Sequence, residues 1–286
     1  MRDAKRGKKK IVPFDILAFF ILLILGIIMI IPFVWMTVVS FERYANIQPP
    51  FPPSFKIRNP SLFNFKLAFE NGYILRAYFN SFIVSASSVV VCLISSTLAG
   101  YAFSKGRFKG KKLLFYLILA TLMIPLETRL IPMYMMFNKI NMVNSFLPLI
   151  LPYMIEGFQI MLSKQFFDHL PDSLREAAYI DGSGEFRTFF NIFLPLTGPI
   201  TATMCILTFM ASWNSFLWPL VMLTGAKSRT VPILMAYYSF TGEGGTRWAG
   251  LTMSVAFLGV IPVIVVFLFL QKYIIRSIAL SGLKGE

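Results

Sequence analysis

Charge is scarce in this chain of 286 residues, because Asp, Glu, Lys and Arg together make up 14% of it. A soluble domain usually carries about 25% charged residues, so a soluble enzyme is excluded. Cysteine and histidine are rarer still, with Cys92, Cys205 and His169 as the only ones. Both cysteines lie in apolar runs without a CxxC or CxxH spacing, which argues against zinc, haem and iron–sulfur sites. We therefore expect no metal site and no covalent catalysis, and we interpret His169 as a surface residue.

Nucleotide-binding and catalytic motifs are also missing. No G-x-x-x-x-G-K-[ST] loop is present to cradle phosphates, and the glycine-rich run Gly242–Gly245 is interpreted as a plain turn. A membrane enzyme would need a cluster of carboxylates or histidines at one interface, and the sequence has none. The chain is therefore expected to be a non-enzyme that carries no cofactor of its own.

Apolar residues, in contrast, make up 56% of the chain, and its mean hydropathy is +0.69. A helix needs about 20 apolar residues to cross a bilayer. The 17 prolines fit such helices, because neighbouring spans can satisfy the carbonyls that a proline frees. The sequence predicts an all-α integral membrane protein with six transmembrane helices, at residues 14–40, 80–103, 113–137, 143–162, 199–223 and 248–274.

Basic residues set the expected orientation. The net charge of +14 is concentrated in the first ten residues, with six basic side chains, and in 105–112, with five. Such clusters remain in the cytoplasm. Both termini are therefore predicted on the cytoplasmic side of a prokaryotic inner membrane. The clusters contain no interleaved aromatics, so no nucleic acid is expected, and the apolar run from Phe14 is too long for a signal peptide. The expected parts are a cytoplasmic N-terminus (1–13), a six-span domain (14–274) and a cytoplasmic tail (275–286).

Two further patterns concern packing. In the outer segment 41–79, apolar residues recur at steps of three and four, at Leu62, Phe65, Phe69 and Tyr73. They predict either a helix in the outer membrane interface or an ordinary packed loop helix. In the second span, the spacing of Ser96, Gly100 and Ser104 predicts close approach of another helix.

The inner loop 163–199 is acidic, and we expect two short cytoplasmic helices in it. Ser173 and Glu176 have the spacing of a capping box, in which each side chain bonds the other's backbone N–H. Gly182 is expected to end the first helix in a left-handed conformation. The second helix carries a stripe of phenylalanines at i, i+3, i+4 and i+7, namely Phe186, Phe189, Phe190 and Phe193. An aromatic face with an acidic rim predicts a docking element.

The same loop resembles the EAA loop of ABC-importer permease subunits. The pattern is Glu176-Ala177-Ala178, three residues, Gly182, nine residues, and then Ile192-x-Leu194-Pro195. The chain is also similar to the carbohydrate-uptake permeases of the maltose-permease inner-subunit type over most of its length. That similarity lies in Asn64-Phe65 to Asn80-Ser81, in GYAF at 100–103, in WNSFLWP at 213–219 and in SGLKG at 281–285.

The resemblance implies a set of partners and a coupling role for the loop. The partners would be a second permease subunit in a heterodimer, two ATP-binding subunits that hold ATP and Mg²⁺, and an extracytoplasmic solute-binding protein. Two coupling helices would fit a cleft on the ATPase and convert its closure into alternating access. The residues expected to couple are Ser173, Glu176, Ala177, Ala178, Asp181, Gly182, Phe186 and Phe190.

Polar and aromatic groups at membrane depth are candidates for the substrate pathway. They are Glu127, Glu156, Gln159, Trp213, Asn214 and Trp218. Alternatives remain for several of them. Glu127 and Arg129 could form a structural ion pair, Glu156 could bond the second permease, and the tryptophans could be interface anchors.

Aromatic faces among amides and carboxylates suit sugar rings, so the expected substrate is a sugar or oligosaccharide. The alternative within the ABC class is a phosphorylated polyol such as glycerol phosphate, which basic groups would favour and Glu156 disfavours. Glu156-Gly157 departs from the small or apolar residues expected in the family. A secondary transporter is less favoured, because repeated halves or broken helices with coupling-ion ligands are not evident.

Overall fold

The computed structural model describes residues 13–48, 53–70, 72–240 and 248–282, and these residues form helices and no strand. The N-terminal residues 1–12, the Gly242–Gly245 run and residues 283–286 lie outside the described residues. The helices in the first half are α1 (Pro13–Phe41), α2 (Phe63–Glu70), α3 (Tyr73–Lys105), α4 (Lys111–Thr121), α5 (Leu126–Lys139), α6 (Leu147–Ile150) and α7 (Gly157–Asp168). Those in the second half are α8 (Ser173–Ile180), α9 (Glu185–Thr188), α10 (Leu194–Leu196), α11 (Gly198–Trp213), α12 (Leu217–Met222), α13 (Val231–Phe240) and α14 (Ala249–Gly282).

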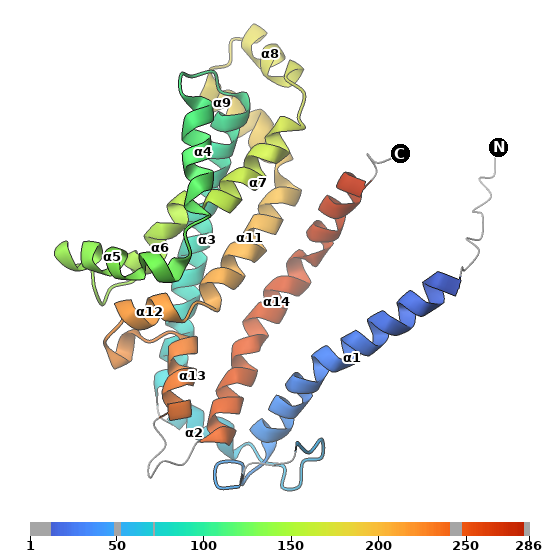
Figure 1. Ribbon diagram of the computed structural model, residues 1–286, viewed down its shortest axis with the longest axis vertical. Helices are drawn as coiled ribbons and strands as arrows, with labels where there is room; N and C mark the ends of the chain where they lie inside the picture. The colour runs from blue at the N-terminus through green and yellow to red at the C-terminus, as the bar shows by residue number, and fades with distance from the viewer. Residues whose placement is uncertain (1–12, 49–52, 71, 241–247, 283–286) are drawn as a thin grey trace.

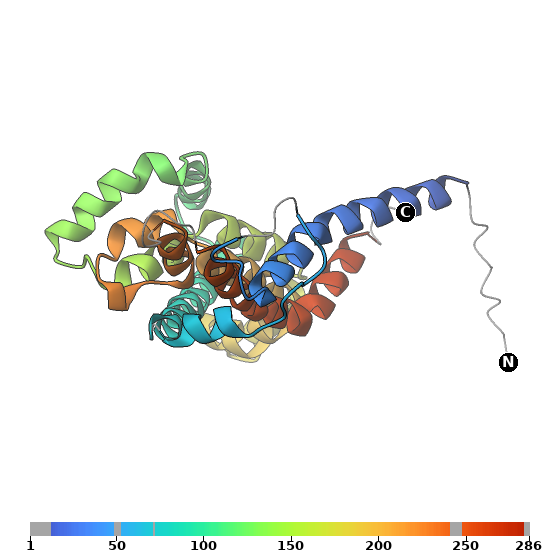
Figure 2. The same ribbon diagram turned by 90° about the horizontal axis from the view of Figure 1, so that it is seen from below.

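Within the described residues, three helices are long and apolar enough to cross a membrane by themselves: α1, α3 and α14. They coincide with the first, second and sixth spans expected from the sequence. In Figure 1 the start of α1 and the end of α14 point toward the end of the molecule that carries α8 and α9, and α2 lies at the opposite end. Figure 2 shows α1 and α14 extending to one side while α5 projects from the other.

The remaining expected spans are not continuous helices, which corrects the expectation of six unbroken ones. Within 113–137, α4 and α5 meet at 101°, with Pro125 immediately before α5. Within 143–162, a 3-10 helix at Leu151–Ile155 gives way to α7 at the extended residue Glu156. Within 199–223, α11 ends at Trp213 and α12 begins at Leu217. Broken helices are therefore present, although hydropathy gave no sign of them.

The centre of the bundle is α3, which packs against α7 and α11, while α14 packs against α11, α13, α1 and α2. The small residue Gly100 permits the α3–α7 contact, because a Cβ there would lie 2.8 Å from the backbone nitrogen of Lys164. The close approach predicted from Ser96, Gly100 and Ser104 is thus present within this chain.

The loop helix α2 is a packed element. Its buried Asn64 donates from Nδ2 to the carbonyl oxygens of Ser40 (3.1 Å) and Glu42 (2.8 Å). Phe65 contacts the rings of Phe41 and Phe257. These bonds attach α2 to the end of α1 and to α14, which favours the packed loop helix among the two alternatives. Leu62, Phe69 and Tyr73 of the same apolar pattern nevertheless stay exposed.

Candidate coupling site and polar cavity

The turn between α8 and α9 is built by Gly182. Its φ of 75° is left-handed, a conformation that favours glycine. The Ser183 N–H donates to the Ala178 oxygen (2.9 Å) and the Gly182 N–H to the Tyr179 oxygen (3.0 Å). These two bonds form a Schellman motif, which satisfies carbonyls at the end of a helix. The left-handed helix end predicted at Gly182 is confirmed.

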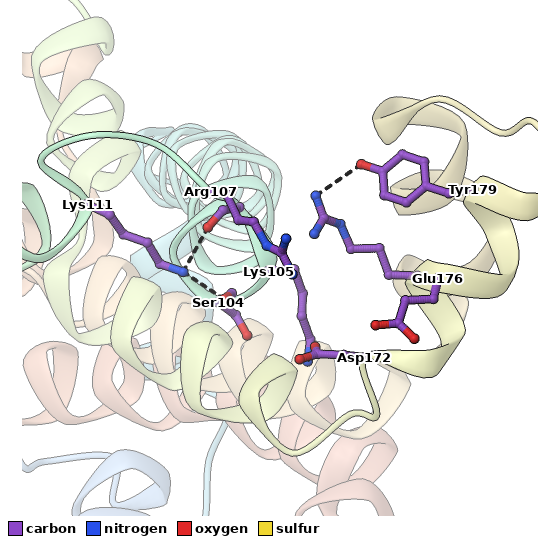
Figure 3. Close-up of a pocket in the computed structure, with 9 residues that line it drawn as sticks. Ser104, Lys105, Arg107, Lys111, Asp172, Glu176 and Tyr179 are labelled. Atoms are coloured by element: carbon purple, nitrogen blue, oxygen red, sulfur yellow. Dashed lines mark hydrogen bonds and ion pairs between the residues drawn. The ribbon is translucent and has the colours of Figure 1, made fainter.

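The capping box predicted at Ser173 and Glu176 is wrong. Asp172 occupies the N-cap position, no side chain caps the helix, and Ser173 is already the first helical residue. The Asp172 carboxylate instead accepts a hydrogen bond from Lys105 Nζ at 2.6 Å. Lys105 thus fixes the start of α8 from α3. The Glu176 carboxylate is left to line an open pocket (Figure 3).

An ion-pair network joins α8, α9 and α3. Arg175 Nη2 lies 2.5 Å from Glu185 Oε1, and the Tyr101 hydroxyl of α3 donates to Glu185 Oε2 at 3.0 Å. Partial burial opposes ionisation of Glu185, but the bonds from Arg175 and Tyr101 outweigh it and lower the pKa of Glu185. The hydrogen bond to Glu185 likewise raises the pKa of Arg175. Sequence reasoning missed this network, whose signal is an opposite-charge pair on the two sides of the Gly182 turn.

Basic residues at the C-terminal end of α3 and the start of α4 fix the end of α3 and the loop beside it. Lys105 Nζ also donates to the Leu170 oxygen (2.6 Å), and its bond to Asp172 lowers the pKa of that carboxyl group. Lys111 Nζ donates to the carbonyl oxygens of Ser104 (2.8 Å) and Gly106 (2.9 Å). A pocket of about 350 Å³ remains between these cations and α8 (Figure 3).

The phenylalanine stripe divides into two pairs, which corrects the single docking face. Phe189 and Phe193 are buried against Tyr101, each with ring centroids 5.1 Å from it. Phe186 is 76% exposed and Phe190 52% exposed. The buried pair lies at the two ends of a π-helical segment, Phe189–Phe193, where the wider turn departs from the period of the α-helix.

The other predicted coupling residues are divided in the same way. Ala178 is buried inside the loop, whereas Glu176, Ala177 and Asp181 are exposed. Ile180, which sequence reasoning did not single out, is 86% exposed. The surface of α8 and α9 therefore combines acidic side chains with Ile180, Phe186 and Phe190.

A second feature is a cavity of about 380 Å³ at the broken helices, lined by residues that precede and follow the coupling loop in the sequence and by none of the loop itself. Its lining comes from α5, from the segment before and after Glu156, from α11 and from α12. The polar and aromatic lining residues are Arg129, Tyr153, Glu156, Phe158, Gln159, Thr208, Ser215 and Trp218. Of the predicted pathway residues, the structure thus brings together Glu156, Gln159 and Trp218. We name this feature the polar cavity.

Three polar side chains of the polar cavity form few direct bonds within the described part of the chain, although Glu156 and Arg129 attract each other over a longer distance. The described residues form four ion pairs, all outside the polar cavity, and these include neither Glu156 nor Arg129. Gln159 is buried and donates from Nε2 to Thr208 Oγ1 (3.2 Å), but its Oε1 accepts no hydrogen bond. Trp218 differs, because its indole N–H donates to the Pro148 oxygen at 2.8 Å.

The remaining pathway candidates lie elsewhere. Glu127 is exposed and forms no ion pair with Arg129 among these four, so that alternative is wrong. Trp213 is buried, donates to the Gly259 oxygen (3.1 Å) and stacks on Phe209. Asn214 is exposed just beyond the end of α11. Trp213 and Trp218 are 3% and 5% exposed, so neither is an interface anchor.

Comparison with known proteins decides the family. Residues 93–280, which contain the loop and the polar cavity, match the family described as binding-protein-dependent transport system inner membrane component. The chain belongs to this family. It is a permease subunit of a binding-protein-dependent ABC importer and not an enzyme.

Individual members of the family are similar over most of the chain. The arabinooligosaccharides transport system permease protein AraQ of Halalkalibacterium halodurans is 37% identical over 226 residues, 79% of this chain and 80% of that protein. The sn-glycerol-3-phosphate transport system permease protein UgpE of Pectobacterium atrosepticum is 34% identical over 199 residues, 70% of each chain. Both alignments cover at least 70% of this chain and so agree with the family match over residues 93–280.

A solved structure shares the fold. It is the crystal structure of a bacterial ABC transporter involved in the import of the acidic polysaccharide alginate. The TM-score is 0.81 at 20% identity, and the alignment covers 91% of this chain and 96% of the other. The two chains therefore share their overall fold.

Proposed function

We propose that this chain forms half of the translocation pathway of an importer for a sugar or oligosaccharide in the inner membrane of a prokaryote. A second permease subunit would form the other half. Two ATPase subunits holding ATP and Mg²⁺, and an extracytoplasmic binding protein, would complete the assembly. The naming of AraQ as an arabinooligosaccharide permease supports the sugar class, and UgpE keeps a phosphorylated polyol as the alternative.

The topology that we propose has six spans, with both termini in the cytoplasm. It counts α1, α3, α11 and α14 as spans, and it takes α4 with α5, and the segment through Glu156 with α7, as two broken ones. A single cysteine at Phe108, between α3 and α4, should then react with a membrane-impermeant maleimide only from the cytoplasm. A cysteine at Phe55 should react only from outside. The reverse pattern would invert the assignment of the loop.

The observation that carries the coupling role is the exposed surface of α8 and α9, held to α3 by Lys105 and by the Arg175–Glu185–Tyr101 network. The surface offers Glu176, Asp181, Phe186 and Phe190 to a partner, while its supports prevent it from moving independently of α3. Movement of a docked ATPase would therefore be transmitted to the membrane spans.

The test is Glu176→Lys in the reconstituted complex. A lost charge-assisted contact of about 1.5–3 kcal/mol corresponds to roughly a tenfold or greater weakening of docking. We expect the subunit to insert and pair normally, while ATPase stimulation by loaded binding protein falls at least tenfold. The matched control is Glu70→Lys, the same charge change at an exposed side chain outside the coupling loop. Equal stimulation in both variants would remove α8 from the coupling role.

A further inference from the structure

We infer that this subunit holds its own substrate subsite, in which the polar cavity binds one neutral, hydroxyl-rich ring between Glu156 and Arg129. The inference rests on the proposed sugar transport and adds where in this chain the sugar binds and why it is uncharged.

The size and lining of the polar cavity are those of a ligand site. Its volume of about 380 Å³ falls in the range of small-molecule pockets, roughly 300–1,000 Å³. Such pockets combine apolar and aromatic walls with a few convergent polar groups. Here Phe158 and Trp218 supply the walls, and Arg129, Glu156 and Gln159 supply the polar groups.

Three separate breaks in the helices surround the polar cavity. Arg129 follows the α4–α5 bend, Glu156 is the extended residue before α7, and Ser215 lies between α11 and α12. Irregular backbone at membrane depth is tolerated only where it is buried in protein or lines a polar cavity. The convergence of three such breaks on one space indicates that the space is built to be polar.

The unpartnered groups also indicate a missing ligand. A buried polar atom without a hydrogen bond costs free energy, yet Gln159 Oε1 has none, and Gln159 itself is 4% exposed. Glu156 and Arg129 line the same cavity but stay outside the ion pairs of the described residues. Two opposite charges that do not pair leave room for a molecule between them.

The charges define the chemistry of that molecule. A sugar hydroxyl can donate to the Glu156 carboxylate and accept from the Arg129 guanidinium, and a second hydroxyl can donate to Gln159 Oε1. The Trp218 N–H already bonds Pro148, so this residue offers only its ring surface. A phosphate or carboxylate on the ligand would be attracted by Arg129 but repelled by Glu156, so the two effects oppose each other and leave the cost of removing its charge from water. The polar cavity therefore selects a neutral saccharide over glycerol phosphate or an acidic sugar.

The test uses the complete transporter in proteoliposomes with arabinotriose, maltotriose and sn-glycerol 3-phosphate as probes. We expect Glu156→Gln and Arg129→Gln each to lower uptake of the neutral saccharide by at least tenfold, mainly through a higher apparent KM. Complex assembly should persist, which gel filtration of the purified complex measures. The control is Lys139→Gln, which removes an exposed cation of α5 that does not line the polar cavity, and it should transport normally.

A second measurement needs no charged-residue variant. Ser215→Cys, in a background with Cys92→Ala and Cys205→Ala, places a thiol in the lining. Arabinotriose or maltotriose should slow its reaction with a small maleimide, and glycerol 3-phosphate should not. Protection by glycerol 3-phosphate alone would overturn the neutral ligand. Unchanged saccharide uptake in Glu156→Gln would overturn the subsite only, whereas a wild-type complex that carries neither saccharide would overturn the sugar assignment as well.

Discussion

The coupling end and the polar cavity treat charge in opposite ways. At the coupling end, Lys105 pairs with Asp172, Arg175 with Glu185 and Lys164 with Asp168. In the polar cavity, Glu156 and Arg129 stay outside the ion pairs of the described chain. A surface that must transmit force needs its parts fixed in advance, and internal pairs do this. A cavity that must bind and release a molecule needs polar side chains that are not already joined in ion pairs.

The largest expected effect separates the two phenylalanine pairs of the coupling end. Phe193→Ala should lower the free energy of unfolding by about 3–5 kcal/mol, because Phe193 is fully buried beside Tyr101 and Phe167. Phe190→Ala should change it little, since that ring is half exposed, and should weaken ATPase docking instead. Thermal unfolding of both variants in detergent measures the difference. Equal losses would show that the stripe is one buried face after all.

The next effect concerns the contact that joins α3 to α7. Gly100→Ala should destabilise the subunit by about 1–3 kcal/mol through overpacking, because the added Cβ meets the Lys164 backbone. Gly26→Ala in α1 is the matched control, since nothing lies within 4 Å of a Cβ there. That variant should be neutral or slightly stabilising. Denaturation of the two variants side by side decides whether α3 needs glycine at this point.

A double-mutant cycle on Arg175→Ala and Glu185→Ala tests whether the coupling end is internally braced. The pair is partly exposed, at 16% and 39% for the two side chains, so we expect a coupling energy of only about 1 kcal/mol. Binding-protein-stimulated ATPase activity should fall in each single variant. A coupling energy of zero with normal stimulation would show that the Arg175–Glu185 pair does not stabilise the coupling end.

Removing the unsatisfied Gln159 Oε1 from the polar cavity should barely change the free energy of unfolding. Gln159→Met deletes an unsatisfied Oε1, and Thr208 keeps Cys92 Sγ as a partner (3.5 Å). The change in the free energy of unfolding should stay below about 1 kcal/mol, while saccharide uptake falls. A large loss of stability would make Gln159 a structural residue.

The smallest effect is a pH dependence of the coupling end. The pKa values of Asp172 and Glu185 are lowered by their cationic partners. Their contribution is therefore complete above the ordinary carboxyl pKa values and is lost as the pH falls through the lowered ones. Hydrogen exchange of α8 and α9 should be constant from pH 8 to 6 and should rise in acid. A rise already at neutral pH would contradict the pairing.

Hydropathy and charge were sufficient for the helical class, for α1, α3 and α14, and for the loop with Gly182. They could not reveal the breaks, because hydropathy reports how apolar a run is and not its direction, which changes by 101° between α4 and α5. Glu156 was predicted as a pathway residue, but not as the position at which the helix breaks. The Arg175–Glu185 pair escaped because ten positions and a left-handed turn separate its members.

Helix α3 has contacts at both ends. Its 33 residues, at about 1.5 Å each, give a rod of about 50 Å, longer than the roughly 30 Å of bilayer hydrocarbon. Near one end Asn80 Nδ2 donates to the carbonyl oxygens of Lys227 and Arg229, both at 2.9 Å, and at the other end Lys105 holds Asp172. Such a rod acts as a lever. A tilt of about 10° around its midpoint moves each end by about 4 Å in opposite directions, which is enough to part a hydrogen bond. A displacement of α3 at the coupling end would therefore break the hydrogen bonds of Asn80 at the opposite end.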